Sequence, residues 1–117
     1  MVKKILVVDD DESILDAVAL ILRDEGYEVR ATSKGEEACV VADSYTPDII
    51  LLDVLMSGVD GRNICKKLKF EEKTKNVPII MISAHPSAHE DVFEYGADKF
   101  LAKPFDANDL LALIESY

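Results

Sequence analysis

Short apolar runs alternate with amphipathic segments along the whole sequence, and this alternation limits the folds that the chain can adopt. The first, third and fourth runs are almost continuously apolar, as parallel strands covered by helices on both faces are. Strands that alternate with helices form a parallel sheet with right-handed crossovers. The sequence therefore predicts an α/β fold, a single three-layer doubly wound (βα)5 domain. The five predicted strands are residues 4–8, 27–32, 48–52, 77–83 and 99–102.

The intervals between the predicted strands carry the start and stop signals of helices. Ile14, Val18 and Leu22 recur at helical spacing, and Gly26 follows at a position where helices commonly end. Capping boxes predict the starts of two further helices, and an aspartate predicts the start of another. The second predicted helix begins at a capping box at 33–36 and ends before Pro47, and the third lies on 61–69 with Ile64 and Leu68 on its inner side. The fourth begins at a capping box at 87–90, which Val92, Phe93 and Gly96 follow. The last begins at Asp106 and has Leu110, Leu113 and Ile114 on its inner side.

Length, charge and cysteine content limit the functions to be considered. The 117 residues suffice for one hydrophobic core, so we expect one domain over residues 1–117. A net charge of −10 argues against direct binding to nucleic acid, and suits metal cations or basic patches on a protein partner. No apolar run is long enough to span a bilayer, so we expect no membrane role. The separated Cys39 and Cys65 fit a reducing cytoplasm.

Polar residues that carry chemistry follow several predicted strands directly. Asp9 and Asp10 follow the first strand, Asp53 follows the third, Ser83 ends the fourth, and Lys103-Pro104 follows the fifth. Ligands of open parallel sheets bind outside the carboxyl ends of the strands, where the strand order reverses. We therefore expect these side chains to lie together at one edge of the sheet.

The chemistry of this set points to a metal and a phosphoryl group. Neighbouring carboxylates repel each other unless a cation neutralises them, and hard oxygen ligands suit Mg²⁺. A carboxylate such as Asp53 can act as a nucleophile and form an aspartyl-phosphate. Lys103 offers a positive charge and Ser83 a hydrogen bond to phosphoryl oxygens, as phosphoryl transfer requires.

At these residues the sequence resembles the receiver domains of two-component response regulators. The matching segments are "VVDDDES", "IILLDVLMSGVDG", "PIIMISAH", "GADKFLAKPF" and the closing helix, in the family's order and spacing. The resemblance covers essentially the whole chain. It implies the flavodoxin-like strand order 2-1-3-4-5.

The resemblance also implies a role for each residue of the phosphoryl and metal site. Asp53 would be the phosphoacceptor and a metal ligand. Asp10 would bind Mg²⁺ directly, Asp9 mostly through water, and the Leu55 backbone carbonyl would complete the protein ligands. Mn²⁺ would be the substitute ion, since it accepts the same oxygen ligands.

Further implied roles concern the response to phosphorylation. Lys103 would pair with the phosphoryl group and Ser83 would be the switch hydroxyl. Phe100 matches the aromatic switch position, which turns inward once the hydroxyl engages phosphate. The Lys103-Pro104 bond is expected to be cis. Ser57 departs from the pattern, because it stands where the family usually has proline.

The leading functional hypothesis is a phosphoacceptor signalling domain that is not a turnover enzyme. It would take a phosphoryl group from a sensor histidine kinase or a phosphotransfer protein and act on a downstream effector or an attached output domain. A second hypothesis is a Mg²⁺-dependent phosphohydrolase of the haloacid-dehalogenase type. A third, a flavodoxin-like nucleotide binder, fits poorly because the acids after the first strand repel phosphate.

Overall fold

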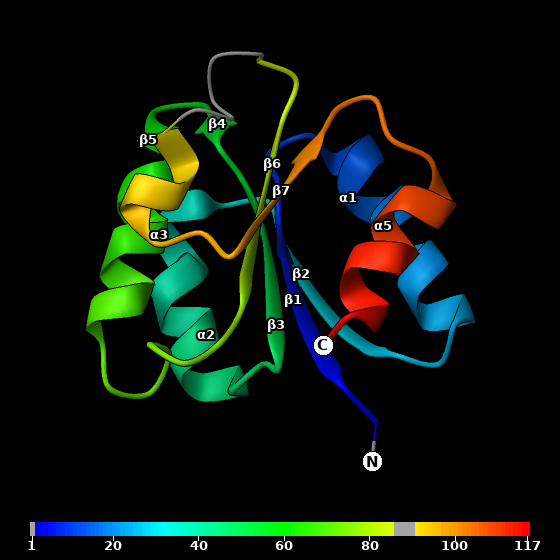
Figure 1. Ribbon diagram of the computed structural model, residues 1–117, viewed down its shortest axis with the longest axis horizontal. Helices are drawn as coiled ribbons and strands as arrows, with labels where there is room; N and C mark the ends of the chain where they lie inside the picture. Colours follow the sequence, from blue (N-terminus) through cyan, green and yellow to red (C-terminus); the bar gives the residue numbers. More distant parts are fainter. Residues whose placement is uncertain (1, 86–90) are drawn as a thin grey trace.

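The computed structural model describes residues 2–85 and 91–117, and its centre is a five-stranded parallel sheet. The strand order is β2-β1-β3-β6-β7, which is the predicted order 2-1-3-4-5 with the strands numbered as in Figure 1. A two-stranded antiparallel hairpin of β4 and β5 follows β3 and was not predicted. The strands are β1 (Lys4–Val8), β2 (Glu28–Thr32), β3 (Ile49–Asp53), β4 (Leu55–Met56), β5 (Val59–Asp60), β6 (Ile79–Ser83) and β7 (Lys99–Ala102).

Helices cover both faces of the sheet, which gives the three predicted layers. Figure 1 shows α2 and α3 on one face and α1 and α5 on the other. Successive residues of a strand point to opposite faces, so Leu6 and Val8 pack on the α2–α3 side while Ile5 and Val7 pack on the α1–α5 side. The helices are α1 (Glu12–Asp24), α2 (Ala38–Tyr45), α3 (Gly61–Phe70) and α5 (Ala107–Glu115), with 3₁₀ turns η1 (Gly35–Glu37) and η2 (Val92–Tyr95).

Several predicted helix boundaries are confirmed by their caps. The Asp106 side chain accepts from the Asp109 backbone N–H, and the Asp109 carboxylate accepts in return from the Asp106 N–H, which makes a complete capping box. Gly26 follows α1 with a φ of 91°, a conformation that glycine adopts readily. These local signals fix where α1 ends and α5 begins.

The predicted start of the second helix was wrong. The capping box at residues 33–36 does not form; Lys34 precedes η1 without a side-chain cap, and α2 begins only at Ala38. The Thr32 hydroxyl accepts the Lys34 N–H instead. A Cβ at Gly35 would approach the Met56 side chain to 3.0 Å, so this turn lies close to the β4–β5 hairpin and leaves little room for a larger residue. The predicted capping box at 87–90 lies outside the described residues.

Within residues 2–85 and 91–117, none of the helices has both the length and the apolar character needed to cross a bilayer.

Candidate functional site

The carboxyl ends of the strands bring three predicted acids together. Asp9 and Asp10 come directly after β1, and Asp53 is the last residue of β3, the neighbour of β1 in the sheet. One carboxylate oxygen from each of the three lies within 4.8 Å of the others. Asp9 and Asp53 are buried, with exposed fractions of 3% and 5%, whereas Asp10 is exposed. The predicted cluster is therefore present at the predicted edge of the sheet.

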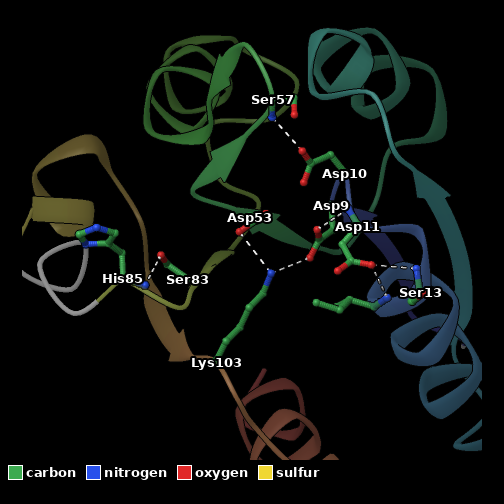
Figure 2. Close-up of polar contacts among 10 residues, drawn as sticks. Asp9, Asp10, Asp11, Ser13, Asp53, Ser57, Ser83, His85 and Lys103 are labelled. Atoms are coloured by element: carbon green, nitrogen blue, oxygen red, sulfur yellow. Dashed lines mark hydrogen bonds and ion pairs between the residues drawn. The ribbon is translucent and has the colours of Figure 1, made fainter.

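Lys103 lies between the two buried acids. Its Nζ is 3.1 Å from Asp9 Oδ2 and 3.6 Å from Asp53 Oδ1, as Figure 2 shows. The Lys103 N–H donates to the Ser83 carbonyl, which continues the pairing of β7 with β6. The Lys103-Pro104 bond is cis, as expected. Burial alone would lower the pKa of Lys103, but the hydrogen bond to Asp9 and the charge of Asp53 raise it above its ordinary value. The ammonium therefore stays charged. We call Asp9, Asp10, Asp53 and Lys103 the strand-end site.

The strand-end site carries more negative than positive charge. Burial, followed by the charge of Asp9, raises the pKa of Asp53 to about 7, although Lys103 acts in the opposite direction. Three carboxylates share one ammonium, so a divalent cation would balance the charge. Three carboxylates with part of the site open to solvent also match the oxygen ligands of Mg²⁺. The residues present therefore fit this ion.

The neighbouring acid Asp11 lies outside the cluster. Its Oδ1 accepts from the Ser13 and Ile14 N–H groups at 3.0 and 3.3 Å, so it caps α1. Its own N–H donates to Asp9 Oδ1 at 3.0 Å. Asp11 therefore serves to begin the helix, and its carboxylate is not part of the acidic cluster.

Two backbone features of the site had no role in the sequence analysis. A Cβ at Gly61 would lie 2.0 Å from the Asp53 carbonyl oxygen, so only glycine lets α3 start this close to the end of β3. The Gly61 N–H donates to the Val54 carbonyl at 2.7 Å. The Ser57 N–H donates to Asp10 Oδ2 at 2.8 Å. A glycine at the start of the helix predicted on 61–69 was the available signal for Gly61, whereas a backbone donor such as Ser57 leaves none.

The predicted switch residues lie on the two strands beyond β3. Ser83 ends β6 and is buried, and its Oγ accepts the His85 N–H at 3.0 Å. Phe100 is a partly buried residue of β7 that packs against the core on the α2–α3 side. Figure 2 places Ser83 on the same edge of the sheet as Asp53 and Lys103. Leu55, whose carbonyl is the expected fourth ligand, begins β4 with a side chain that is 51% exposed.

Comparisons with known proteins agree with this geometry. Residues 5–115 match the family described as response regulator receiver domain. The DNA-binding dual master transcriptional regulator RpaA of Synechocystis is 35% identical over 97% of this chain and 48% of its own length. The alkaline phosphatase synthesis transcriptional regulatory protein PhoP of Bacillus subtilis is 39% identical over 99% of this chain and 48% of its own length. The chain thus spans about half the length of the curated relatives it matches.

Solved structures give the same result. A putative response regulator from Chloroflexus aurantiacus superposes with a TM-score of 0.93 and 37% identity, covering 99% of this chain and 97% of the other. The Vibrio cholerae chemotaxis protein CheY4 superposes with a TM-score of 0.93 and 32% identity, covering 99% and 98%. With the sheet order and the strand-end acids, these matches show that the chain belongs to the response regulator receiver domains of two-component systems.

Proposed function

We propose that Asp53 is the phosphoacceptor of this receiver domain, and that Asp9, Asp10, Asp53 and the Leu55 carbonyl hold Mg²⁺ beside it. The observation that carries the proposal is the placement of one buried carboxylate within 4.8 Å of two others and 3.6 Å from an ammonium. The three carboxylates outnumber the one ammonium beside them, which leaves negative charge for a cation to neutralise and a carboxylate that can accept a phosphoryl group.

The transfer is a displacement at phosphorus by an Asp53 carboxylate oxygen. The new oxygen–phosphorus bond forms as the phosphorus–nitrogen bond of the donor phosphohistidine breaks, and the imidazole nitrogen leaves with the electron pair. Asp53 must be ionised to attack, and its raised pKa of about 7 makes ionisation costly in the metal-free site. Bound Mg²⁺ supplies positive charge that favours the ionised carboxylate and offsets the charge of the phosphoryl oxygens.

Lys103 and Ser83 would respond to the new phosphoryl group. Lys103 already lies 3.6 Å from Asp53 and would move its charge onto a phosphoryl oxygen. The Ser83 hydroxyl, which now accepts the His85 N–H, would donate to another. Phe100 on the adjacent strand would then turn inward, which changes the surface near β7.

The donor protein would approach along α1. A groove of about 350 Å³ lies between α1 and the segment after β7, and its lining includes Ile14, Ile21, Phe105 and Lys103. Its lining is mostly apolar, and Lys103 connects it to the strand-end site. An apolar helix surface of a sensor histidine kinase or phosphotransfer protein fits such a groove.

The output would be a changed surface read by a downstream effector or an attached output domain. The RpaA relative is a DNA-binding regulator about twice as long, and we assign DNA contacts to such an output domain. The net charge of −10 disfavours nucleic-acid binding by the receiver itself. Receiver domains are signalling domains, and we expect this one to act in the cytoplasm and to lose its phosphoryl group slowly to water.

The phosphohydrolase hypothesis has no support from the family and structure matches. The absence of turnover of a free phosphomonoester by the wild type would agree with this conclusion.

Uptake of phosphoryl from a small donor tests the proposed function. With acetyl phosphate or phosphoramidate and Mg²⁺, intact-mass analysis should show one added phosphoryl group that base removes. Asp53→Asn should show none, whereas Asp24→Asn, the same change at an exposed position at the end of α1, should behave as wild type. An adduct that persists in Asp53→Asn would move the acceptor elsewhere.

A further inference from the structure

The solvent-facing surface of α3 combines cations with an exposed aromatic ring. Asn63, Lys66, Lys67 and Phe70 follow one another at i, i+3, i+4 and i+7, the spacing of residues on one face of a helix. All four are exposed, and the exposed fraction of Phe70, 89%, is the largest among the large apolar residues that the structure describes. Figure 1 shows α3 beside the β4–β5 hairpin, across the sheet from α1 and α5.

A groove of about 700 Å³ is lined by this face of α3 and by the hairpin. Its apolar lining comes from Val59 of β5, Ile64 of α3 and the ring of Phe70. Ile64 is buried and belongs to the core, so the groove has a fixed floor. A single exposed apolar residue is common on protein surfaces. Phe70 differs, because it borders a hollow in which a second apolar side chain can pack against it.

The charged residues of the groove leave an excess of positive charge. Asp60 at its edge is already paired with Arg62 at 2.9 Å. Lys66 and Lys67 form no ion pair with any residue that the structure describes, and Glu71 is the one acid of the lining of which the same is true. The excess is local, since α3 carries four cations and no acid whereas the whole chain has a net charge of −10.

We propose that this groove is a docking site for an acidic segment of a partner protein that carries an aromatic or aliphatic anchor beside its carboxylates. The anchor packs against Val59, Ile64 and Phe70, and the carboxylates pair with Lys66 and Lys67.

The length of the exposed face limits the spacing of these groups in the partner. From residue 63 to residue 70 the helix rises about 10 Å, which an extended segment covers with about three residues. The anchor and the acids therefore stand within about three positions of each other.

The charges around the groove favour a protein segment over a polyanion. Glu71 and Glu72 directly follow Phe70. Asp43 and Lys73 pair at 3.6 Å beside the same ring. Nucleic acids and anionic membranes bind broad basic surfaces, and the acids at this end of α3 repel them. Two lysines bordered by acids suit one or two carboxylates, which a peptide presents singly.

The docking site is separate from the site of phosphorylation. It lies across the sheet from the groove beside α1 where we place the phosphodonor, so the two partners can bind together. It uses neither Asp53 nor Mg²⁺, and the inference therefore does not rest on the proposed function.

Selection from a library of random short peptides displayed on phage, with the full chain as bait in the presence of EDTA, tests the docking site. We expect enriched peptides that combine Asp or Glu with an aromatic or aliphatic residue, and amide shifts from such a peptide that centre on α3 and β5. Lys66→Glu combined with Lys67→Glu should weaken binding at least about tenfold, because two attractions become repulsions. Phe70→Ser should weaken it about tenfold through lost apolar contact.

Matched changes across the sheet are the controls. Arg23→Glu and Leu20→Ser alter exposed residues of α1 and should leave binding within about twofold, since charges on that side are screened from the groove. Selection that enriches no acidic peptide, or equal loss of binding in the control variants, would overturn the inference.

Two further measurements test the other occupants. Binding to phosphatidylglycerol vesicles that the double lysine change abolishes would assign the groove to a membrane surface. A wild-type dimer in sedimentation that Phe70→Ser dissociates would assign it to a second copy of this chain. Either result would overturn docking of an acidic segment, and we expect neither.

Discussion

Two groups of charged side chains on this domain differ in how their charges are matched. In the first, which we call the α3 clamp, two cations of α3, Arg62 and Lys69, pair closely with carboxylates. Arg62 pairs with Asp60 at 2.9 Å and with Asp91 at 2.6 Å, and Lys69 pairs with Asp98 at 2.7 Å. The second is the strand-end site, in which three carboxylates share one ammonium. The clamp joins α3 to the segments before and after η2, whereas the strand-end site brings more carboxylates together at the ends of β1 and β3 than its one ammonium neutralises.

The titration of one acid from each group shows the same difference. The hydrogen bond from Arg62 holds the pKa of Asp60 below its ordinary value, despite partial burial. Burial and the charge of Asp9 raise the pKa of Asp53 to about 7. A matched acid stabilises the fold as an anion, while an unmatched buried acid destabilises it until a cation binds. Excess negative charge therefore distinguishes the strand-end site from the α3 clamp.

The largest expected effect separates the lysines of the two groups. Lys103→Ala should abolish the surface change that follows phosphorylation, because no ammonium remains to pair with the phosphoryl group. Lys69→Ala should lower stability and leave that change intact. Amide spectra of β6 and β7, recorded before and after addition of a phosphodonor, measure this surface change. A full surface change in Lys103→Ala, or no surface change in Lys69→Ala, would contradict the different roles assigned to the two lysines.

Magnesium should stabilise the protein through the strand-end site. Binding to the folded state alone contributes about 2.7 kcal/mol when the ion is at a hundredfold excess over Kd, so the melting temperature should rise. Asp10→Asn should raise the melting temperature of the metal-free protein by relieving repulsion, and should weaken the response to Mg²⁺. Asp98→Asn in the clamp should keep that response. A wild type indifferent to millimolar Mg²⁺ would count against the metal site.

The two groups should respond to pH with opposite signs. The folded-state pKa of Asp53 is raised, so its contribution to metal-free stability is present below its ordinary value of 3.8 and is lost as pH rises through about 7. The pKa of Asp60 is lowered, so its contribution is present above its ordinary value and is lost as pH falls through the lowered one. Urea unfolding across this range in the presence of EDTA measures both effects. Asp53→Asn should remove the first trend and Asp60→Asn the second; the same pH profile in wild type and Asp53→Asn would contradict this assignment.

The smallest effect concerns how long the phosphoryl group stays on Asp53. Leu55 follows the acceptor by two positions, is 51% exposed and has no group with which to orient water. Because positioning of water contributes much of the rate of hydrolysis, we expect decay over many minutes, and Leu55→Asn should speed it several-fold. His85→Ala should change it less. Loss of the phosphorylated mass after donor removal measures the rate. Decay of wild type within seconds would show that Leu55 is not a brake.

The sequence predicted the features that repeat or that carry side-chain chemistry. Five apolar strands, their order by resemblance, and the acids at the ends of β1 and β3 were all confirmed. Helix starts depended on the local signal. Asp106 forms its capping box, whereas the similar pattern at Ser33 is followed by the 3₁₀ turn η1, close to Met56 of the hairpin. The pattern alone did not distinguish these two outcomes.

The β4–β5 hairpin and its bond to Asp10 could not be predicted from the pattern. Strands of two residues show no alternation, and a Ser57 backbone N–H has no side-chain signature. The close approach of Gly61 to the Asp53 carbonyl likewise depends on how α3 docks against β3. Side-chain chemistry therefore located the site, while its backbone supports required the structure.

Chemical mapping of the phosphoryl group can show directly whether Asp53 is the residue that accepts it. After phosphorylation from acetyl phosphate with Mg²⁺, borohydride reduces the acyl carbon of an aspartyl-phosphate to a primary alcohol and releases phosphate. Peptide sequencing by mass spectrometry then locates the alcohol. We expect the alcohol at position 53 alone. An alcohol at Asp9 or Asp10, or a phosphorylated protein in which no aspartate is reduced, would contradict it.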